Sequence, residues 1–171
     1  IGSVDLISPY PADSPTPSCS GVVLAPWPNR VRDGRWNDEG TERQLAITEP
    51  KFSNASHGLL RFTAYNIEET ASATTLSATI VPQTGYPYLI ETSVTYVLRA
   101  DGIDVTHALT NRSATAAPVA LGTHPFVTIS DVDPDELVLR VPAQTQITTD
   151  ERMLPTGTRP ADAALRDGAR L

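Results

Sequence analysis

The sequence has one cysteine and one lysine in 171 residues, and each scarcity excludes a class of protein. Cys19 alone cannot form a disulfide within the chain or a cysteine-based zinc cluster, and we interpret it as an unreactive loop residue in a reducing compartment. Lys51 is the single lysine, and the formal net charge is -7 with a pI of about 4.8. Nucleic-acid binding depends on clustered lysine and arginine, so the composition argues against a nucleic-acid partner.

The sequence also lacks long apolar runs and a recognisable leader. No uninterrupted apolar stretch approaches the roughly 20 residues that a helix needs to cross a bilayer. Residues 1–5 show neither a basic segment nor a cleavage pattern, so no secretory signal is visible. Hydrophobic residues make up 40% and charged residues 19% of the chain, as in a folded domain with a sizeable core. We therefore expect a soluble, cytoplasmic protein with no membrane partner.

Motifs of several enzyme classes are missing as well. There is no G-x-S-x-G nucleophile elbow, no phosphate-binding P-loop and no H-E-x-x-H zinc motif. Of the three histidines, His107 shares an alternating strand face with Ile103, and we interpret it as a packed or edge residue. His57 and His124 lie in irregular segments, but two ligands are too few for a zinc site. We therefore predict no metal site.

Period-two alternation is the strongest pattern that the sequence does contain. Residues 61–68, 74–81 and 89–98 are rich in threonine, valine, isoleucine and tyrosine, with apolar and polar side chains alternating. Asp101-Gly102 stands between two such runs and is typical of a β-hairpin whose turn tolerates a positive φ. No segment longer than ten residues has clean helical periodicity. The pattern predicts an all-β protein of the sandwich or barrel type.

Turn signals divide the remainder of the chain. Residues 8–20 are crowded with proline and serine and predict an ordered loop. Residues 21–25 predict a short buried strand, and residues 35–45 predict a hairpin around a Glu-Gly turn. Toward the C-terminus, residues 137–141 predict another strand and residues 148–157 an irregular segment.

The candidate functional residues lie in three irregular stretches between predicted strands. In residues 121–126, a proline biases His124 toward an extended backbone, which fixes the direction of its imidazole. Residues 54–58 end in His57 and a glycine, which lets the backbone approach a ligand closely. The third stretch, residues 26–30, reads Pro-Trp-Pro-Asn-Arg. A lone histidine is more often a satisfied turn residue, but the three stretches together favour a functional site.

Five motifs between about Tyr10 and Gly157 resemble, in order and spacing, those of the aldose 1-epimerases, or galactose mutarotases. The motifs are P-N-R-V from Pro28, N-A-S-H-G from Asn54, G-Y-P from Gly85, G-T-H-P-F from Gly122, and Asp150 followed by L-P-T-G from Leu154. Each motif is weak alone, and the five in this order are quite specific. The resemblance implies an all-β fold, a large twisted antiparallel β-sandwich of the galactose mutarotase type, of which this chain would be a part.

The resemblance also implies an activity and a set of residue roles. Aldose 1-epimerases interconvert the α and β anomers of free aldoses by opening and reclosing the sugar ring, without a cofactor. His124 would be the general acid that protonates the ring oxygen, and His57 would assist at that oxygen or a neighbouring hydroxyl. Asn29 and Arg30 would bind sugar hydroxyls, and Phe126 would lie beside the sugar. These residue types suit the chemistry, because a histidine pKa of about 6.5 permits proton donation near neutral pH.

The sequence departs from the family in its carboxylates. The general base of these enzymes is a glutamate near the C-terminus, with a sugar-binding aspartate upstream of it. Glu91, Glu136 and Glu151 are present here, but none of them stands in the base motif. We therefore expect residues 1–171 to form a single β-sandwich domain that is incomplete at both ends and inactive in isolation, with the base outside this chain.

Two other functions stay open at this stage. One is a non-catalytic carbohydrate-binding module, which a downstream glutamate in the family context would argue against. The other is a protein like the hexose 6-phosphate 1-epimerases, which would need arginines for the phosphate; Arg32, Arg35 and Arg61 are available. Tyr86 and Tyr88 favour a tight turn into a strand, with sugar stacking as the lesser alternative. Every alternative has a small-molecule sugar as partner, and none fixes an oligomeric state.

Overall fold

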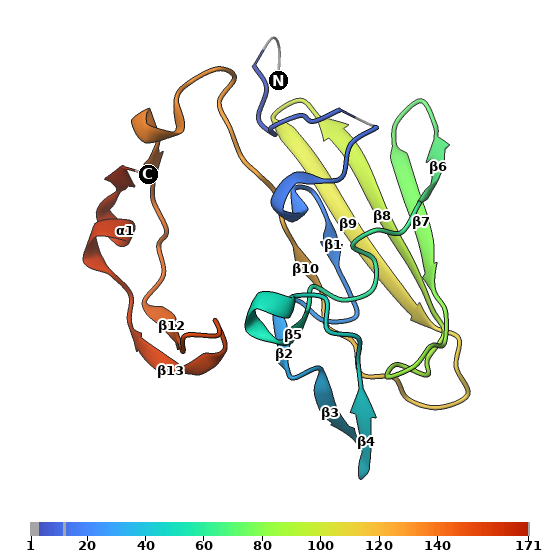
Figure 1. The fold of residues 1–171 in the computed structure, drawn as a ribbon. Coiled ribbons are helices and arrows are strands. Elements are labelled where there is room, and N and C mark those ends of the chain that lie inside the picture. Colours follow the sequence, from blue (N-terminus) through green and yellow to red (C-terminus); the bar gives the residue numbers. More distant parts are fainter. Residues whose placement is uncertain (1–3, 12, 171) are drawn as a thin grey trace. The chain divides into compact units, whose positions relative to one another are not determined.

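The computed structural model describes residues 4–11 and 13–170, and these residues form mostly β-strands (Figure 1). They divide into two compact units, one of residues 21–124 and one of residues 4–20 (without 12) and 125–170. Within the described residues, the single α-helix, α1 (Ala163–Asp167), has five residues. No helix in this part of the chain is long and apolar enough to span a membrane. The predicted all-β fold with little helix is confirmed.

The unit of residues 21–124 combines one four-stranded sheet with three two-stranded ladders, all antiparallel. Its elements are β1 (Val23–Leu24), β2 (Arg30–Arg32), β3 (Arg35–Asp38), β4 (Thr41–Gln44), the 3-10 helix η2 (Pro50–Phe52), β5 (Asn54–Ser56), β6 (Asn66–Glu69), β7 (Thr74–Ile80), β8 (Ile90–Arg99), β9 (Gly102–Asn111) and β10 (Gly122–Thr123). The long strands β7, β8 and β9 run side by side in Figure 1.

The hairpin of β8 and β9 forms where the sequence predicts it. Arg99 pairs with Gly102, so Ala100 and Asp101 are the two turn residues. Neither of them has a positive φ. The glycine lies just beyond the turn as the first residue of β9, so the hairpin is confirmed, and its turn does not use the positive φ that an Asp-Gly pair tolerates.

The predicted strand over residues 61–68 is wrong in its first five residues. β6 begins at Asn66. Before it, the chain turns: the N–H of Thr63 donates to the carbonyl of Leu60 (3.2 Å), and the Thr63 hydroxyl donates to the carbonyl of Leu59 (3.1 Å). These two bonds engage backbone groups that a strand would offer to a neighbouring strand.

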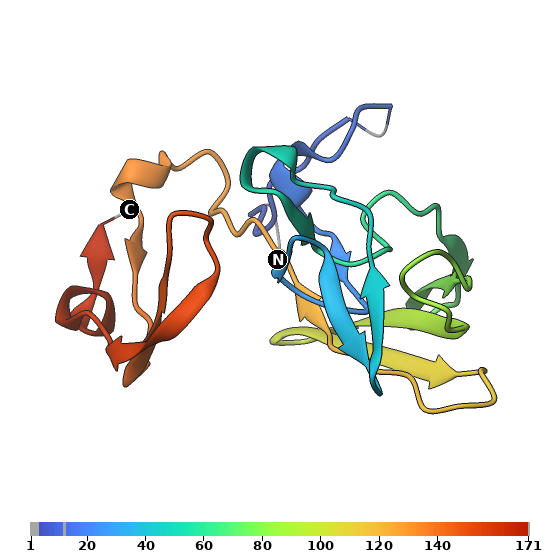
Figure 2. The same ribbon diagram turned by 60° about the horizontal axis from the view of Figure 1, so that its bottom comes forward.

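The hairpin predicted over residues 35–45 is present as β3 and β4, which lie side by side in Figure 2. Its turn residues are Glu39 (φ 47°) and Gly40 (φ 94°). Two positive φ values match the twist of the flanking strands, which explains the Glu-Gly pair at this position.

The core of this unit joins the four-stranded sheet to the shorter ladders. Its buried members are Ala25, Leu45, Ala55, Leu60, Ala78, Ile80, Tyr86, Tyr88 and Ile90. Tyr86 and Tyr88 are only 2% and 7% exposed, and the hydroxyl of Tyr88 donates to Asp38 (2.6 Å). Because both rings are buried, neither is open to stack on a sugar, and the tight-turn interpretation of this stretch holds.

The second unit contains the chain ends and differs from the sequence expectation in two places. Its elements are η1 (Pro17–Cys19), η3 (Pro134–Glu136), β11 (Val138–Leu139), β12 (Thr145–Thr149), β13 (Pro155–Pro160), α1 and β14 (Ala169–Arg170). Residues 148–157, predicted to be irregular, belong to a hairpin in which β12 pairs with β13. The strand predicted over 137–141 shortens to β11. Cys19 is buried in η1, and the single-domain assignment of 1–171 stays a prediction.

Candidate functional site

Two of the three irregular stretches are joined by a short antiparallel ladder. β2 pairs with β5 in the register Arg30↔Ser56, Val31↔Ala55 and Arg32↔Asn54. Just beyond this ladder, the N–H of His57 donates to the carbonyl of Asn29 (2.8 Å). Backbone hydrogen bonds therefore hold Asn29, Arg30 and His57 in one corner of the unit.

His57 is followed by a glycine that the packing requires. Gly58 has a φ of 71°, and a Cβ added to it would lie 2.1 Å from the carbonyl oxygen of Ala25. The same oxygen accepts a hydrogen bond from the N–H of Leu59 (2.7 Å). A side chain cannot fit into this close approach, so the backbone on both sides of His57 is fixed.

The third stretch brings His124 to the same corner. β1 pairs with β10 in the register Val23↔Thr123 and Leu24↔Gly122, and the N–H of Gly21 donates to the carbonyl of His124 (2.8 Å). Gly122 is again tightly packed, since a Cβ there would lie 2.9 Å from Cβ of Pro28. The rings of His57 and His124 meet edge to face, with centroids 5.5 Å apart and an interplanar angle of 84°.

Arg30 is paired with Glu49, a carboxylate that the sequence motifs do not indicate. Glu49 accepts hydrogen bonds from Nε (2.7 Å) and Nη2 (2.8 Å) of Arg30, and one from Nδ2 of Asn54 (3.4 Å). The side chains of Arg30 and Glu49 are 16% and 21% exposed. The hydrogen bonds from Arg30 lower the pKa of the Glu49 carboxyl, and the same contact raises the pKa of Arg30. Both members are therefore charged at neutral pH.

Arg30 makes three side-chain hydrogen bonds and keeps two N–H groups that these bonds do not use. Nη1 donates to Oδ1 of Asn29 (2.9 Å), in addition to the two bonds to Glu49. A guanidinium has five N–H groups, so one N–H on each terminal nitrogen is left for a ligand. Asn29 is exposed and adopts a left-handed backbone with a φ of 56°. The two residues predicted to bind sugar hydroxyls are thus hydrogen-bonded to each other and partly exposed.

The charges around His57 favour its neutral form. Burial lowers its pKa, and His124, Arg30 and Arg61 lower it further, while Glu49 raises it. His57 is therefore neutral at pH 7. Its Nδ1 is buried and has no hydrogen-bond partner among the described residues. Buried polar atoms are rarely left unsatisfied, so this nitrogen is a candidate contact for a bound ligand.

Phe126 lies in the other unit, where its carbonyl accepts a hydrogen bond from the N–H of Ser8 (3.0 Å). Its predicted place beside the sugar stays a prediction.

In the described part of the chain, no group of three or more histidine, cysteine, aspartate and glutamate side chains is arranged to hold a metal ion. The groups that the corner of Asn29, Arg30, His57 and His124 offers to a ligand are imidazole, guanidinium and amide groups.

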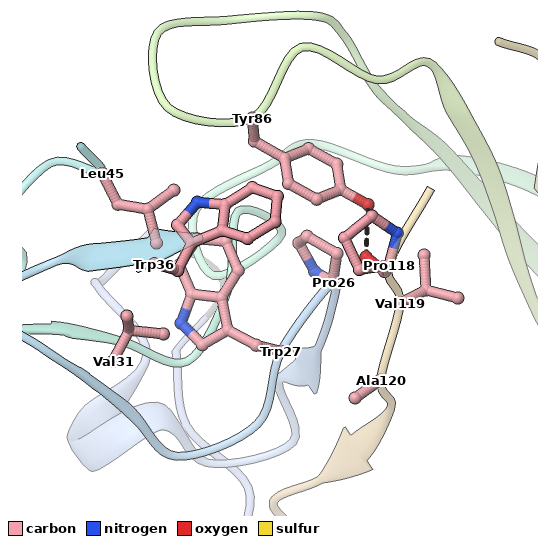
Figure 3. A pocket seen from close by; sticks show the side chains of 9 residues that line it. All are labelled: Pro26, Trp27, Val31, Trp36, Leu45, Tyr86, Pro118, Val119 and Ala120. Carbon is pink, nitrogen blue, oxygen red and sulfur yellow. Dashed lines mark hydrogen bonds between the residues drawn. The ribbon is translucent and has the colours of Figure 1, made fainter. Parts of the chain in front are cut away.

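An apolar pocket of about 260 Å³ is lined in part by residues that flank Asn29 and Arg30 in the sequence (Figure 3). It is lined by Pro26, Trp27, Val31, Trp36, Leu45, Tyr86, Pro118, Val119 and Ala120. The hydroxyl of Tyr86 donates to the carbonyl of Pro118 (2.9 Å), as the dashed line in Figure 3 marks. Its lining is largely apolar and includes Trp27 and Val31, which flank Asn29 and Arg30.

The fold is that of the galactose mutarotase-like proteins. One solved structure that it matches is the GalM/aldose epimerase homologue from C. elegans, with a TM-score of 0.82 at 18% identity over 96% of this chain and 54% of that chain. Another is galactose 1-epimerase from Lactobacillus acidophilus NCFM, with a TM-score of 0.78 at 18% identity over 99% of this chain and 54% of that chain. These likenesses define the fold class.

The sequence itself defines the family. The aldose 1-epimerase family profile matches residues 4–170, and the chain belongs to this family. The uncharacterized protein YihR of Escherichia coli (strain K12) is 37% identical over 153 residues, which cover 88% of this chain and 50% of YihR. The chain thus spans about half the length of the relatives it matches.

Proposed function

We propose that this chain carries the acid side of an aldose 1-epimerase site, and that the protein interconverts the α and β anomers of an aldose. The observation that carries the proposal is the meeting of His57 and His124, 5.5 Å apart between ring centroids, beside the Asn29–Arg30 corner. Membership of the aldose 1-epimerase family supports a sugar as the substrate. Ring opening needs one proton delivered to the ring oxygen and another taken from the anomeric hydroxyl.

In this mechanism His124 is the general acid at the ring oxygen. His57, neutral because its pKa is lowered, supplies a hydrogen bond to the ring oxygen or to an adjacent hydroxyl. Its buried Nδ1, which has no partner among the described residues, supports a contact that forms only with a ligand. The mechanism needs no cofactor, because it breaks and remakes the hemiacetal C–O bond with proton transfers and without a change of oxidation state.

Arg30 and Asn29 hold the sugar in both its cyclic and its opening form. The bidentate contact with Glu49 orients the guanidinium, so that its remaining N–H groups meet the hydroxyls without a further loss of side-chain freedom. Phe126 is assigned to the side of the sugar by its place in the G-T-H-P-F motif. It is the one proposed site residue outside the unit of residues 21–124.

The general base is assigned to a residue outside these 171 positions. Glu49 is unsuited to the task, because Arg30 and Asn54 occupy its oxygens and its pKa is lowered. Asp150 is engaged too, since its Oδ1 accepts the N–H groups of Arg152 and Leu154. Glu136 stays the competing candidate within the chain. The 171-residue chain in isolation is therefore proposed to be inactive.

The test is the anomerisation of freshly dissolved α-glucose and α-galactose, followed by polarimetry with the complete gene product. Acceleration proportional to protein concentration is the expected result. Binding of these sugars without any acceleration would instead identify a carbohydrate-binding module. If the protein neither binds these sugars nor accelerates their anomerisation, the proposal is overturned.

A further inference from the structure

Residues 49–54 form a tight turn that leads into the N-A-S-H-G stretch of the site. Glu49 and Asn54 close this turn, since the N–H of each donates to the carbonyl of the other (3.0 and 3.3 Å). Inside the turn, the N–H of Phe52 donates to the carbonyl of Glu49 (3.2 Å), and that of Ser53 donates to the carbonyl of Pro50 (3.1 Å). The backbone that carries Phe52 is therefore held by hydrogen bonds at both ends of the turn.

This turn makes two contacts with Arg30. Glu49 accepts from Nε and Nη2 along one edge of the guanidinium. The guanidinium carbon also lies over the ring of Phe52, 5.9 Å from its centroid. Lys51 is exposed and places its Nζ 5.1 Å from the same centroid. One short segment thus supplies both a carboxylate and an aromatic ring to the arginine that is proposed to bind the sugar.

The packing of the core does not account for an aromatic residue at position 52. Phe52 is half-buried. In the described part of the chain, it is neither a buried member of the core cluster nor one of the partly buried side chains that pack against that cluster. Cation–π attraction is significant only within about 6 Å of a ring centroid, so at 5.9 Å it is weak. What the ring offers Arg30 is mainly a surface against which the guanidinium packs.

Such a surface complements the hydrogen bonds of Arg30. Two parallel bonds to one carboxylate hold one edge of the guanidinium, and they allow it to tilt about that edge. Asn29 accepts a third bond, from Nη1, but Asn29 is exposed and is itself proposed to bind the sugar. Its amide oxygen is thus shared between Arg30 and the proposed ligand. The ring of Phe52 limits the tilt without using any of the donors.

We propose that Phe52 is a positioning residue, which holds Arg30 so that its two remaining N–H groups face the sugar hydroxyls. The inference rests on the proposed epimerase function and adds a residue that lies in none of the five family motifs. Phe52 acts through Arg30 and needs no contact of its own with the sugar. A side chain that is already held in its bound orientation loses less freedom on binding, so the ring should tighten the binding of the sugar.

The experiment is a double-mutant cycle between Phe52 and Arg30, with anomerisation of α-glucose and α-galactose by the complete gene product as the readout. Phe52→Leu keeps an apolar side chain and loses the ring, so it should raise KM about 3- to 10-fold and lower kcat by a smaller factor. The same change made in Arg30→Ala should alter KM by less than about 1.5-fold, because the group that Phe52 holds is gone. Phe52→Tyr retains the ring and should keep KM within about twofold of the wild-type value.

Lys51→Gln is the matched control, because it removes the other cation at the Phe52 ring and leaves Arg30 in place. It should keep KM and kcat within about twofold of the wild-type values. Hydrogen exchange of the Arg30 Nε–H, followed by NMR, tests the contact without kinetics. This exchange should be faster in Phe52→Leu than in the wild type, because a guanidinium that tilts breaks its bond to Glu49 more often.

Four results would overturn the inference and leave the proposed function standing. One is a wild-type KM in Phe52→Leu, and another is a wild-type exchange rate of the Arg30 Nε–H in that variant. A rise in KM that is equally large with and without Arg30 would show that the ring does not act through Arg30. Equal effects of Phe52→Leu and either Phe52→Tyr or Lys51→Gln would show that the ring is not the positioning group. If the wild type anomerises neither sugar, the proposed function fails, and this narrower claim fails with it.

Discussion

Replacing Glu49 with glutamine tests whether the Arg30–Glu49 pair holds the site together. The change keeps the size of the side chain and removes the carboxylate that accepts from Nε and Nη2 of Arg30. Pairs exposed to solvent contribute about 0–1 kcal/mol, and breaking a fully buried pair costs about 3–5 kcal/mol. With side chains 16% and 21% exposed, Arg30 and Glu49 lie between these limits. We expect Glu49→Gln to lower the free energy of unfolding by about 2 kcal/mol at pH 7.

The cost should also depend on pH, in a direction that the structure fixes. The folded-state pKa of Glu49 is lowered from its ordinary value of 4.5 by the hydrogen bonds from Arg30. The charged carboxylate therefore contributes its full stabilisation above about pH 4.5, and this contribution is lost as the pH falls through the lowered pKa. The difference between wild type and Glu49→Gln should accordingly shrink in acid.

Urea unfolding followed by the fluorescence of Trp27 and Trp36 measures the effect at pH 7 and at acid pH. Glu42→Gln is the matched control, because Glu42 pairs with Arg35 at 3.3 Å with both side chains more than half exposed. It should cost less than about 0.5 kcal/mol. Equal costs for the two variants, or a Glu49→Gln cost that does not change in acid, would refute the reasoning.

Three further variants or proteins extend the test. Gly58→Ala should destabilise the fold by about 2–5 kcal/mol more than Gly21→Ala. Both glycines have a φ near 70°, but only at Gly58 would an added Cβ lie 2.1 Å from a carbonyl oxygen. Equal unfolding midpoints of the two variants would contradict this packing. Arg30→Ala should raise KM as well as lower kcat, since it holds hydroxyls before and during ring opening; a kcat effect alone would exclude this role. The 171-residue chain alone should leave α-glucose anomerising at the uncatalysed rate, because the base factor of roughly 10²–10⁴ is missing; turnover equal to that of the complete gene product would place the base within it.

The fold and the close backbone packing beside His57 and His124 were predictable because their signals are local. Period-two alternation marks β7, β8 and β9, where residues two apart share a face of the sheet. A glycine within two residues of each of His57 and His124 signals a close backbone approach, and Gly58 and Gly122 do pack against Ala25 and Pro28. These features follow from a few consecutive residues.

Glu49 could not be predicted in the same way. Its contact with Arg30 depends on the pairing of β2 with β5 and on the bridge between Glu49 and Asn54, none of which a motif spacing encodes. The hairpin of β12 and β13 was missed for a related reason. Strand β13 contains two prolines and a glycine, which are depleted in strands in general, and the pairing of Thr145–Thr149 with Pro155–Pro160 overrides that preference.

The central claim is that His124 delivers the proton that opens the sugar ring, and one measurement tests it most directly. In the complete gene product, His124→Ala should lower kcat for anomerisation about 10²- to 10⁴-fold with little change in sugar binding, because a general acid acts in the transition state. His107→Ala, at a strand position in β9, is the control and should keep the wild-type kcat. A folded His124→Ala variant that anomerises the sugar at the wild-type rate would contradict the assignment.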